Sequence, residues 1–62
     1  MLFSNIQALC REHHISIREL EALCGIGNGT IYKWQNSMPA VDKVKLVADY
    51  FGCTIDELLK ED

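Results

Sequence analysis

The most constraining feature of the sequence is a stretch, residues 15–34, that reads as two short helices joined by a tight turn. Ser16 is a suitable N-cap, and Glu19 three residues later completes a capping box at the start of the first helix. Apolar side chains then recur at helical spacing, at Ile17, Leu20, Leu23 and Cys24. Gly25 is expected to end this helix near residue 24, because only glycine enters the left-handed conformation there without a steric cost.

A second short helix is expected over residues 28–35, with Ile31 and Trp34 facing inward. Gly27 and Gly29 flank Asn28 at its start, and a glycine inside a helix costs about 1 kcal/mol. This favours a helix that orders fully only on its target. A helix, a glycine-containing turn and a second helix form the layout in which the second helix enters the major groove of DNA.

Two longer helices are expected before and after this pair. Ser4 and Gln7 have capping-box spacing and predict a helix over residues 4–13, with an inner stripe of Ile6, Leu9, Cys10 and His13. Pro39 ends a loop that begins near residue 36. A helix is then expected over residues 40–51, with an inner stripe of Val41, Val44, Val47, Ala48 and Phe51.

Thr54 and Glu57 have the capping-box spacing that opens a last helix, over residues 55–60. Its inward side chains are Ile55 and Leu58, with Leu59 as a further candidate. With the helices expected over 16–24 and 28–35, the chain is predicted to be an all-α, compact five-helix domain. We find no strand pattern, repeat or linker.

The chain has 62 residues, of which 48% are hydrophobic, and this is enough for one small domain with a core. No apolar run approaches the roughly 20 residues of a membrane span, and residues 1–3 are too short for a signal peptide. Three cysteines, an odd number, lie on apolar faces, which favours a reduced, cytoplasmic location. We expect a single domain over residues 1–62, with no effector or catalytic domain after it.

The net charge of −3 disfavours nucleic-acid binding at first sight, but the charge is unevenly distributed. Residues 16–45 carry four basic and three acidic side chains, a charge of +1. Residues 46–62 carry one basic and five acidic side chains, a charge of −4. The acid therefore lies at the C-terminus, and the region expected to bind is mildly basic.

The chain resembles the lambda-repressor-like family, the helix-turn-helix domains of phage repressors and Cro-like proteins. In the two central helices it has the family's residues in register at Leu20, Gly25, Ile26, Thr30, Ile31 and Trp34. The match continues through Pro39, Val41, Val44, Val47, Ala48, Phe51, Gly52, Thr54, Ile55, Asp56, Glu57 and Leu58, so that it covers about residues 5–59. Where the family has Gln, Ala, Glu and Gly, this chain has Ile17, Glu21, Gln35 and Ser37.

The resemblance implies two sets of DNA-contacting residues. The set expected to reach base edges is Gly27, Asn28, Gly29, Thr30, Tyr32 and Lys33. Of these, the chemistry suits Asn28 to adenine, Lys33 to guanine or a phosphate, and Thr30 to a thymine methyl. The set expected to contact phosphates is Ser16, Ile17, Arg18, Asn36, Ser37 and Lys43. The side chain of Ile17 cannot replace the family's Gln, although its backbone N–H can still donate.

Three short motifs suggest other kinds of site. Residues 25–29, GIGNG, look like a phosphate-binding loop, but no strand precedes them and no Gly-Lys-Ser/Thr follows. Asn28-Gly29 is a hairpin signal, which the helical stripes on both sides oppose. Cys10, His13 and His14 have ligand spacing without a matched second pair, so that no metal site and no cofactor are expected. No catalytic set is apparent, and enzyme activity is not expected.

The prediction for function is a sequence-specific, DNA-binding transcriptional regulator of the small repressor or Cro type. A protein-interaction module that keeps the fold and has weak or no DNA binding is the alternative, and the DNA-binding half of a toxin–antitoxin pair is a third. The expected partners are double-stranded DNA and a second copy in a weak homodimer. An exposed apolar patch for that contact is predicted at Leu46, Tyr50 and Leu59, and scattered surface residues are its alternative.

Overall fold

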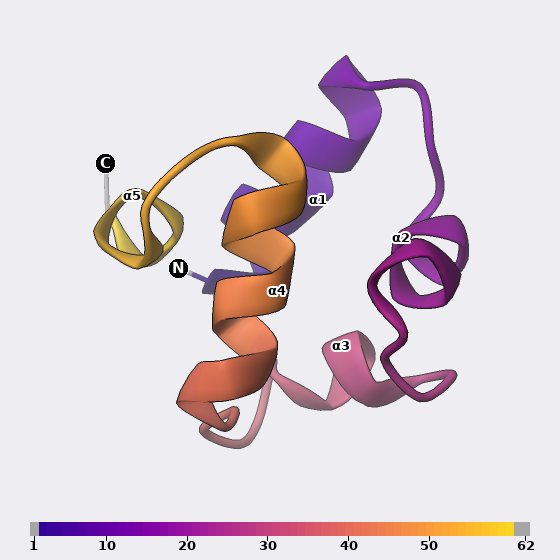
Figure 1. Ribbon diagram of the computed structural model, residues 1–62. Coiled ribbons are helices and arrows are strands. Elements are labelled where there is room, and N and C mark those ends of the chain that lie inside the picture. Colours follow the sequence, from indigo (N-terminus) through magenta and orange to yellow (C-terminus); the bar gives the residue numbers. More distant parts are fainter. Residues whose placement is uncertain (1, 61–62) are drawn as a thin grey trace.

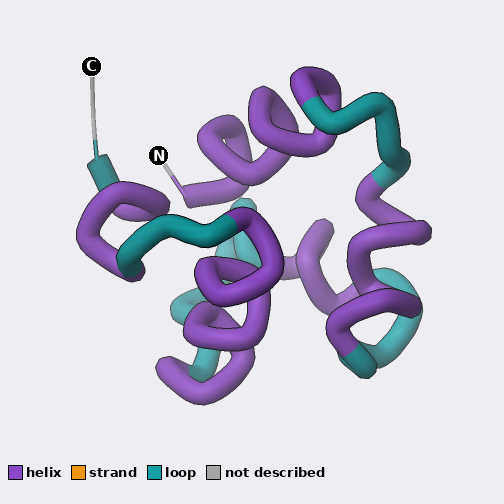
Figure 2. Tube along the Cα trace, turned by 45° about the horizontal axis from the view of Figure 1, so that its top comes forward, coloured by secondary structure: helices purple, strands orange, loops and turns teal. Residues whose placement is uncertain are grey.

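The structure, a computed structural model, describes residues 2–60 and consists of helices joined by short loops, with no strand in that range (Figures 1 and 2). In chain order the helices are α1 (Leu2–Glu12), α2 (Ile17–Cys24), α3 (Thr30–Lys33), α4 (Val41–Phe51) and α5 (Ile55–Leu59). The predicted all-α, five-helix fold is confirmed.

Each helix contributes at least one large, fully buried apolar side chain to a single core. These side chains, all 0% exposed, are Ile6, Leu20, Ile31, Val47 and Leu58. α1 packs against α5 and α2, α4 packs against α2 and α5, and α3 packs against α2. Because every helix buries its apolar face on the others, α3 is held at the surface by the core rather than by its own four residues.

Two of the three helix starts that the sequence marks by capping boxes are confirmed. The Ser16 hydroxyl accepts a hydrogen bond from the Glu19 N–H, and the Glu19 carboxylate accepts one from the Ser16 N–H, both at 3.0 Å. Thr54 and Glu57 form the same reciprocal pair at the start of α5. Gly25 ends α2 with φ of 72°, in the left-handed region that favours glycine.

The predicted start of α1 was wrong, and its end differs from the prediction by one residue. The helix already includes Leu2, so Ser4 lies inside it and is not the N-cap. It ends at Glu12, because His14 adopts a left-handed φ of 57°. His13 consequently lies outside the core stripe and is exposed, although its ring contacts that of Phe51 at a centroid distance of 5.0 Å.

Two side chains that were assigned to the core, Leu23 and Val41, are exposed. Leu23 is 61% exposed, whereas Glu21 is 2% exposed. The inner stripe of α2 therefore runs through position 21, one turn after Ile17 and directly beside Leu20. Val41 is 72% exposed because it lies in the first turn of α4, beyond the edge of the core.

The Asn5 side chain, near the N-terminal end of the fold, forms hydrogen bonds with the C-terminal end. The Asn5 amide donates hydrogen bonds to the backbone carbonyls of Leu58 at 2.7 Å and Lys60 at 2.6 Å. These carbonyls lie at the end of α5, where a helix leaves its last acceptors without partners. Asn5 therefore caps the end of α5 from a helix more than fifty residues earlier in the chain.

Within residues 2–60, no helix has the length and apolar character required to cross a membrane.

Candidate nucleic-acid interface

The segment between α2 and α3 is a turn, and not the start of a helix as predicted. Gly29 has a left-handed φ of 85°, which keeps Gly27, Asn28 and Gly29 outside the helix. The Thr30 N–H closes the turn by donating to the Gly27 carbonyl at 3.1 Å. The predicted helix over residues 28–35 is therefore only Thr30–Lys33, and three of the six candidate base-contacting residues lie in the turn before it.

The C-terminal end of α3 lies at Lys33, two residues before the predicted end at residue 35. The Trp34 N–H donates to the Ile31 carbonyl at 3.0 Å, three residues back, which is the tighter 3₁₀ pattern common at helix ends. The Gln35 side chain follows the helix and donates to the Tyr32 carbonyl at 3.2 Å. Trp34 is buried at 8% exposure, as the sequence predicts, and anchors this end of α3.

The sequence analysis missed one residue that shapes this turn, because it noted Glu21 only as a departure from the family. Its carboxylate accepts hydrogen bonds from the N–H groups of Gly29 and Ile31, both at 2.9 Å. Among residues 2–60, no buried side-chain nitrogen or oxygen lacks a hydrogen-bond partner. An acid on the inner stripe of α2, followed by a helix start with glycines in place of an N-cap side chain, is the signal that could have revealed this contact.

Residues from both predicted contact sets meet in one hollow at the surface. Its lining consists of Ser16, Arg18, Asn28, Gly29 and Tyr32. The Arg18 guanidinium donates from Nε to the Asn28 side-chain oxygen at 3.4 Å. Both side chains are exposed, so that a positive charge lies directly beside the amide proposed to read a base.

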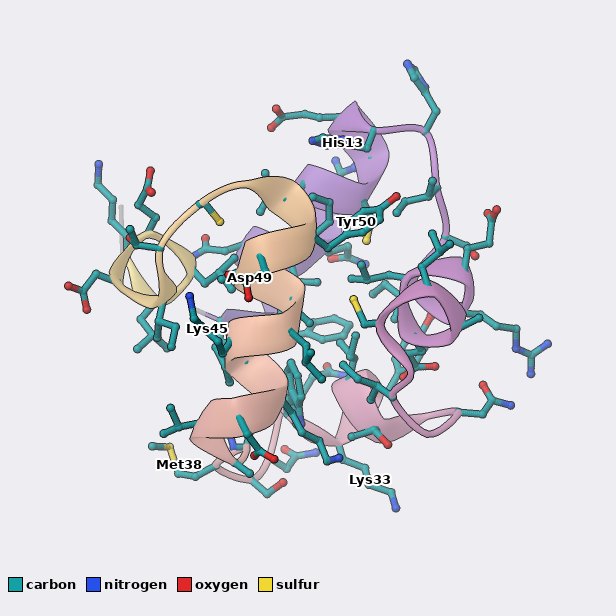
Figure 3. All side chains as sticks on the ribbon, in the orientation of Figure 1. His13, Lys33, Met38, Lys45, Asp49 and Tyr50 are labelled. Carbon is teal, nitrogen blue, oxygen red and sulfur yellow. The ribbon has the colours of Figure 1, made fainter. Side chains whose placement is uncertain are left out.

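The remaining candidates for base contact lie on α3. Tyr32 is 52% exposed, and its ring lies against Phe3 of α1 at 5.6 Å between centroids. Lys33 is exposed and extends away from the body of the domain (Figure 3). Thr30, at the start of the helix, is half-buried.

The candidates for phosphate contact are unequal in what they can still donate. Ile17 buries its side chain in the core at 6% exposure, which leaves only its backbone N–H. Ser37 already uses its hydroxyl and its N–H on the Lys33 carbonyl, at 2.9 and 3.1 Å. Ser16 and Asn36 are exposed and Lys43 is half-buried. Lys45 is also positively charged, but it forms an ion pair with Asp49, at 2.9 Å, on the outer face of α4 (Figure 3).

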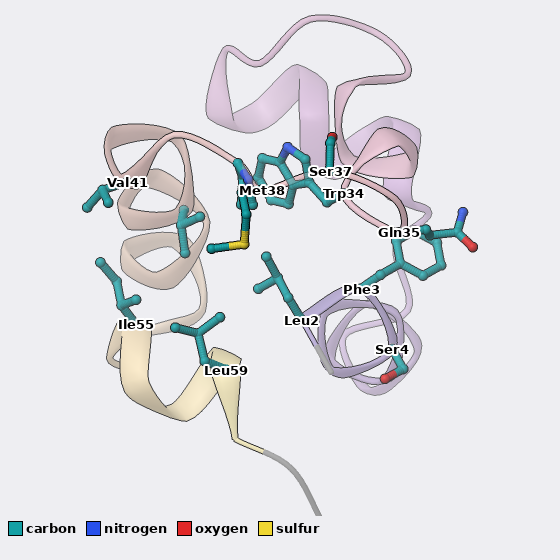
Figure 4. A pocket seen from close by; sticks show the side chains of 12 residues that line it. Leu2, Phe3, Ser4, Trp34, Gln35, Ser37, Met38, Val41, Ile55 and Leu59 are labelled. Carbon is teal, nitrogen blue, oxygen red and sulfur yellow. The ribbon is translucent and has the colours of Figure 1, made fainter.

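The three residues of the predicted apolar patch fall into two places. Leu46 and Tyr50, 45% and 41% exposed, lie on α4, and the Leu46 carbonyl is within 3.8 Å of the Cys24 sulfur of α2. Leu59 instead lines an apolar groove of about 520 Å³ that also contains Met38 and Val41 (Figure 4). Met38 is 93% exposed at the rim of this groove.

Cys10 lies in the core, and Cys24 and Cys53 are partly buried against it. Burial raises the pKa of Cys10, and the nearby Cys24 raises it further; burial also raises the pKa values of Cys24 and Cys53. A raised pKa disfavours the thiolate that nucleophilic chemistry or metal binding needs. Within residues 2–60, no three His, Cys, Asp or Glu side chains are grouped to hold a metal ion.

Comparison with known proteins adds one finding to this geometry. A family model for the Cro/C1-type helix-turn-helix DNA-binding domain matches residues 5–61, almost the whole chain. No match was found among curated proteins or among solved structures. The matched range contains α2, the glycine-rich turn and α3 in the order that a helix-turn-helix requires. The chain belongs to the Cro/C1-type helix-turn-helix DNA-binding domain family.

Proposed function

We propose that this protein is a sequence-specific transcriptional regulator of the small repressor or Cro type, and that it acts by binding DNA without catalysing a reaction. The observation that carries the proposal is the juxtaposition of Arg18 and Asn28 at 3.4 Å, on the helix-turn-helix of a DNA-binding family. In this arrangement a cation that suits a phosphate lies beside an amide that suits a base edge.

The glycine turn and α3 together form the reading element. Asn28 is the residue suited to the N6 and N7 atoms of adenine, and Lys33 is suited to guanine. Thr30 offers a methyl and a hydroxyl at the start of α3. Because α3 has only four residues, we expect the turn before it to contribute to the contact with DNA as well.

Arg18 and Lys43 supply the phosphate contacts of this proposal, with Ser16, Asn36 and the Ile17 N–H as neutral donors. Few basic side chains are available, so we expect micromolar affinity for a monomer and a weak dependence on salt. Ser37 is the weakest member of the set, since both its donors already bond to Lys33.

Two classes of substitution are expected to have different effects on DNA binding. Asn28→Ala or Thr30→Ala should relax discrimination at one or two base pairs, by about 1–3 kcal/mol for a good bidentate contact. Arg18→Ala or Lys43→Ala should weaken binding to all sequences alike and reduce the log–log salt slope by about 1. The measurement is a salt-dependent fluorescence titration against a selected operator and a scrambled duplex.

Lys60→Ala is the matched control, because it removes the same charge beyond α5 and should leave the slope nearly unchanged. Wild-type protein that binds neither duplex at low salt would contradict the proposal. Equal binding to both duplexes, unaffected by changes in the turn or α3, would also contradict it and favour the protein-interaction module.

A weak homodimer on DNA is part of the proposal, because a domain this small reads few base pairs and two half-sites about 34 Å apart double them. Leu46→Glu with Tyr50→Glu and, separately, Leu59→Glu should each be tested by sedimentation with and without operator DNA. We expect one of the two variants to abolish the second binding step and the other to leave it intact. A wild-type protein that stays monomeric at millimolar concentration and on each half-site would rule the dimer out.

A further inference from the structure

The structure joins α2 and α3 through the Glu21 side chain. Its two carboxylate oxygens accept separate hydrogen bonds, Oε1 from the Gly29 N–H and Oε2 from the Ile31 N–H, each at 2.9 Å. The side chain is 2% exposed, so water contributes little to its solvation. A carboxylate buried to this degree needs hydrogen-bond donors to offset its lost hydration, and these two amides provide them.

We propose that Glu21 is a positioning residue for DNA recognition, and that its carboxylate acts as the N-terminal cap of α3 supplied from another helix. This inference rests on the function proposed above, because Glu21 is inferred to hold the element that reads bases in its shape. The cap fixes the turn at residues 27–30 in the conformation that presents Asn28. Specificity for the operator therefore depends on a residue that does not touch DNA.

The sequence around the start of α3 shows why a cap from outside is needed. A helix start is normally satisfied by a Ser, Thr, Asp or Asn side chain at the N-cap. The N-cap here is Gly29, which has no side chain, and Gly27 before it has none either. Glu21 supplies the missing oxygen, and its negative charge also suits the positive end of the helix dipole.

The cap changes what the start of α3 offers to DNA. The N–H groups of Gly29 and Ile31 donate to Glu21, and that of Thr30 donates to the Gly27 carbonyl. A free helix start offers such N–H groups to a phosphate, but these three are already satisfied inside the protein. DNA recognition here is left to the side chains of the turn and of α3.

α2 constrains Asn28 from two sides. Arg18 and Glu21 are three residues apart on α2 and so lie on neighbouring parts of its surface. Arg18 bonds to the Asn28 side chain at 3.4 Å, and Glu21 bonds to the N–H of Gly29, the next residue. The pair restricts rotation of the Asn28 amide, which lowers the entropy lost when that amide binds a base.

The test combines amide hydrogen exchange, which needs no DNA, with operator binding. In the wild-type protein the Gly29 and Ile31 amides should exchange slowly. Glu21→Gln keeps the side-chain shape but places an NH₂ group against one of the two N–H donors. We expect that amide to exchange at least about tenfold faster, since a buried hydrogen bond to a charged group is lost, and the operator-to-scrambled affinity ratio to fall by a similar factor.

Glu12→Gln is the matched control, because Glu12 is exposed and its loss removes the same charge. It should leave the exchange rates and the affinity ratio unchanged. If the effect of Glu21 were only one of charge, both variants would bind both duplexes more tightly and by similar factors. The salt slope should be the same in both, since no phosphate contact is altered.

A second pair of variants tests the cap by restoring it locally. Gly27→Ser in a Glu21→Ala background adds a hydroxyl acceptor to the turn, two residues before the N-cap Gly29. Its Cβ would lie 3.2 Å from the Thr30 hydroxyl oxygen, so the Thr30 side chain must shift by a few tenths of an ångström. We expect slower exchange and a higher affinity ratio than in Glu21→Ala alone.

The outcomes separate the parts of the inference. Fast exchange of the Gly29 and Ile31 amides in folded wild-type protein would overturn the cap, even if Glu21 variants fail to fold. Faster exchange with an unchanged affinity ratio would leave Glu21 a structural cap and overturn its role in positioning. Slow exchange in a wild-type protein that binds no DNA would overturn the positioning role through failure of the proposed function, while the cap itself would stand.

Discussion

Replacing Trp34 with alanine is expected to lower the free energy of unfolding by about 3–5 kcal/mol, the usual range for a large buried aromatic side chain. The indole is only 8% exposed and belongs to the single core at the point where α3 ends. At roughly 0.05–0.15 kcal/mol per residue, a domain of this size has a total stability of about 3–9 kcal/mol. Loss of Trp34 therefore removes a large fraction of it, and urea unfolding followed by circular dichroism measures the change.

Met38→Ala is the control for Trp34, since Met38 lies four residues later and is 93% exposed. Its substitution should change the stability by no more than about 0.5 kcal/mol. Equal effects of the two substitutions would show that the indole is not part of the core. Native Trp fluorescence with a red-shifted maximum and full access to a soluble quencher would lead to the same conclusion.

Replacing Glu21 with alanine, the residue that the resembled family has at this position, is expected to destabilise the domain by about 2–4 kcal/mol. The change leaves the N–H groups of Gly29 and Ile31 without their acceptor, and a buried hydrogen bond to a charged group contributes about 1.5–3 kcal/mol. Entry of water into the space vacated by the side chain offsets part of this loss. Thermal and urea unfolding of the variant give the free energy directly.

Glu12→Ala is the comparison for Glu21, because it removes an exposed carboxylate from the neighbouring helix α1. It should be nearly neutral. A Glu21→Ala protein as stable as wild type would mean that the two amides find other acceptors and that the buried carboxylate is dispensable. Substitution toward a family pattern often raises the stability of a protein. In this chain we expect Glu21→Ala, which is such a substitution, to lower it.

Much of the fold could be predicted because its helix ends are encoded by local chemistry. Ser16, Gly25 and Thr54 each act within a few residues of their own position, so sequence alone identified their roles. Ser4 was misread because a capping-box pattern also occurs inside a helix, as it does in α1. The end of α1 was missed because it depends on a left-handed His14, a conformation that the sequence of a non-glycine residue does not announce.

The candidate site could be predicted only in part. Its location followed from the register of the resemblance, but the length of α3 depends on Gly29 adopting a left-handed conformation. On α2 the structure buries Glu21 and exposes Leu23, which is the opposite of what their hydrophobicity predicts. Glu21 is buried because two backbone amides eight and ten residues away need its oxygens, and such a partnership becomes visible only once the chain has folded.

The hydrogen bonds between Asn5 and the end of α5 have a consequence for how this protein folds. The carbonyls that accept hydrogen bonds from Asn5, those of Leu58 and Lys60, are synthesised more than fifty residues after α1. An isolated helix of eleven residues is marginal in water, and α1 lacks its α5 partner until the end of the domain has been made. The packing of α1 on α5 therefore forms only after the chain through residue 60 has been synthesised.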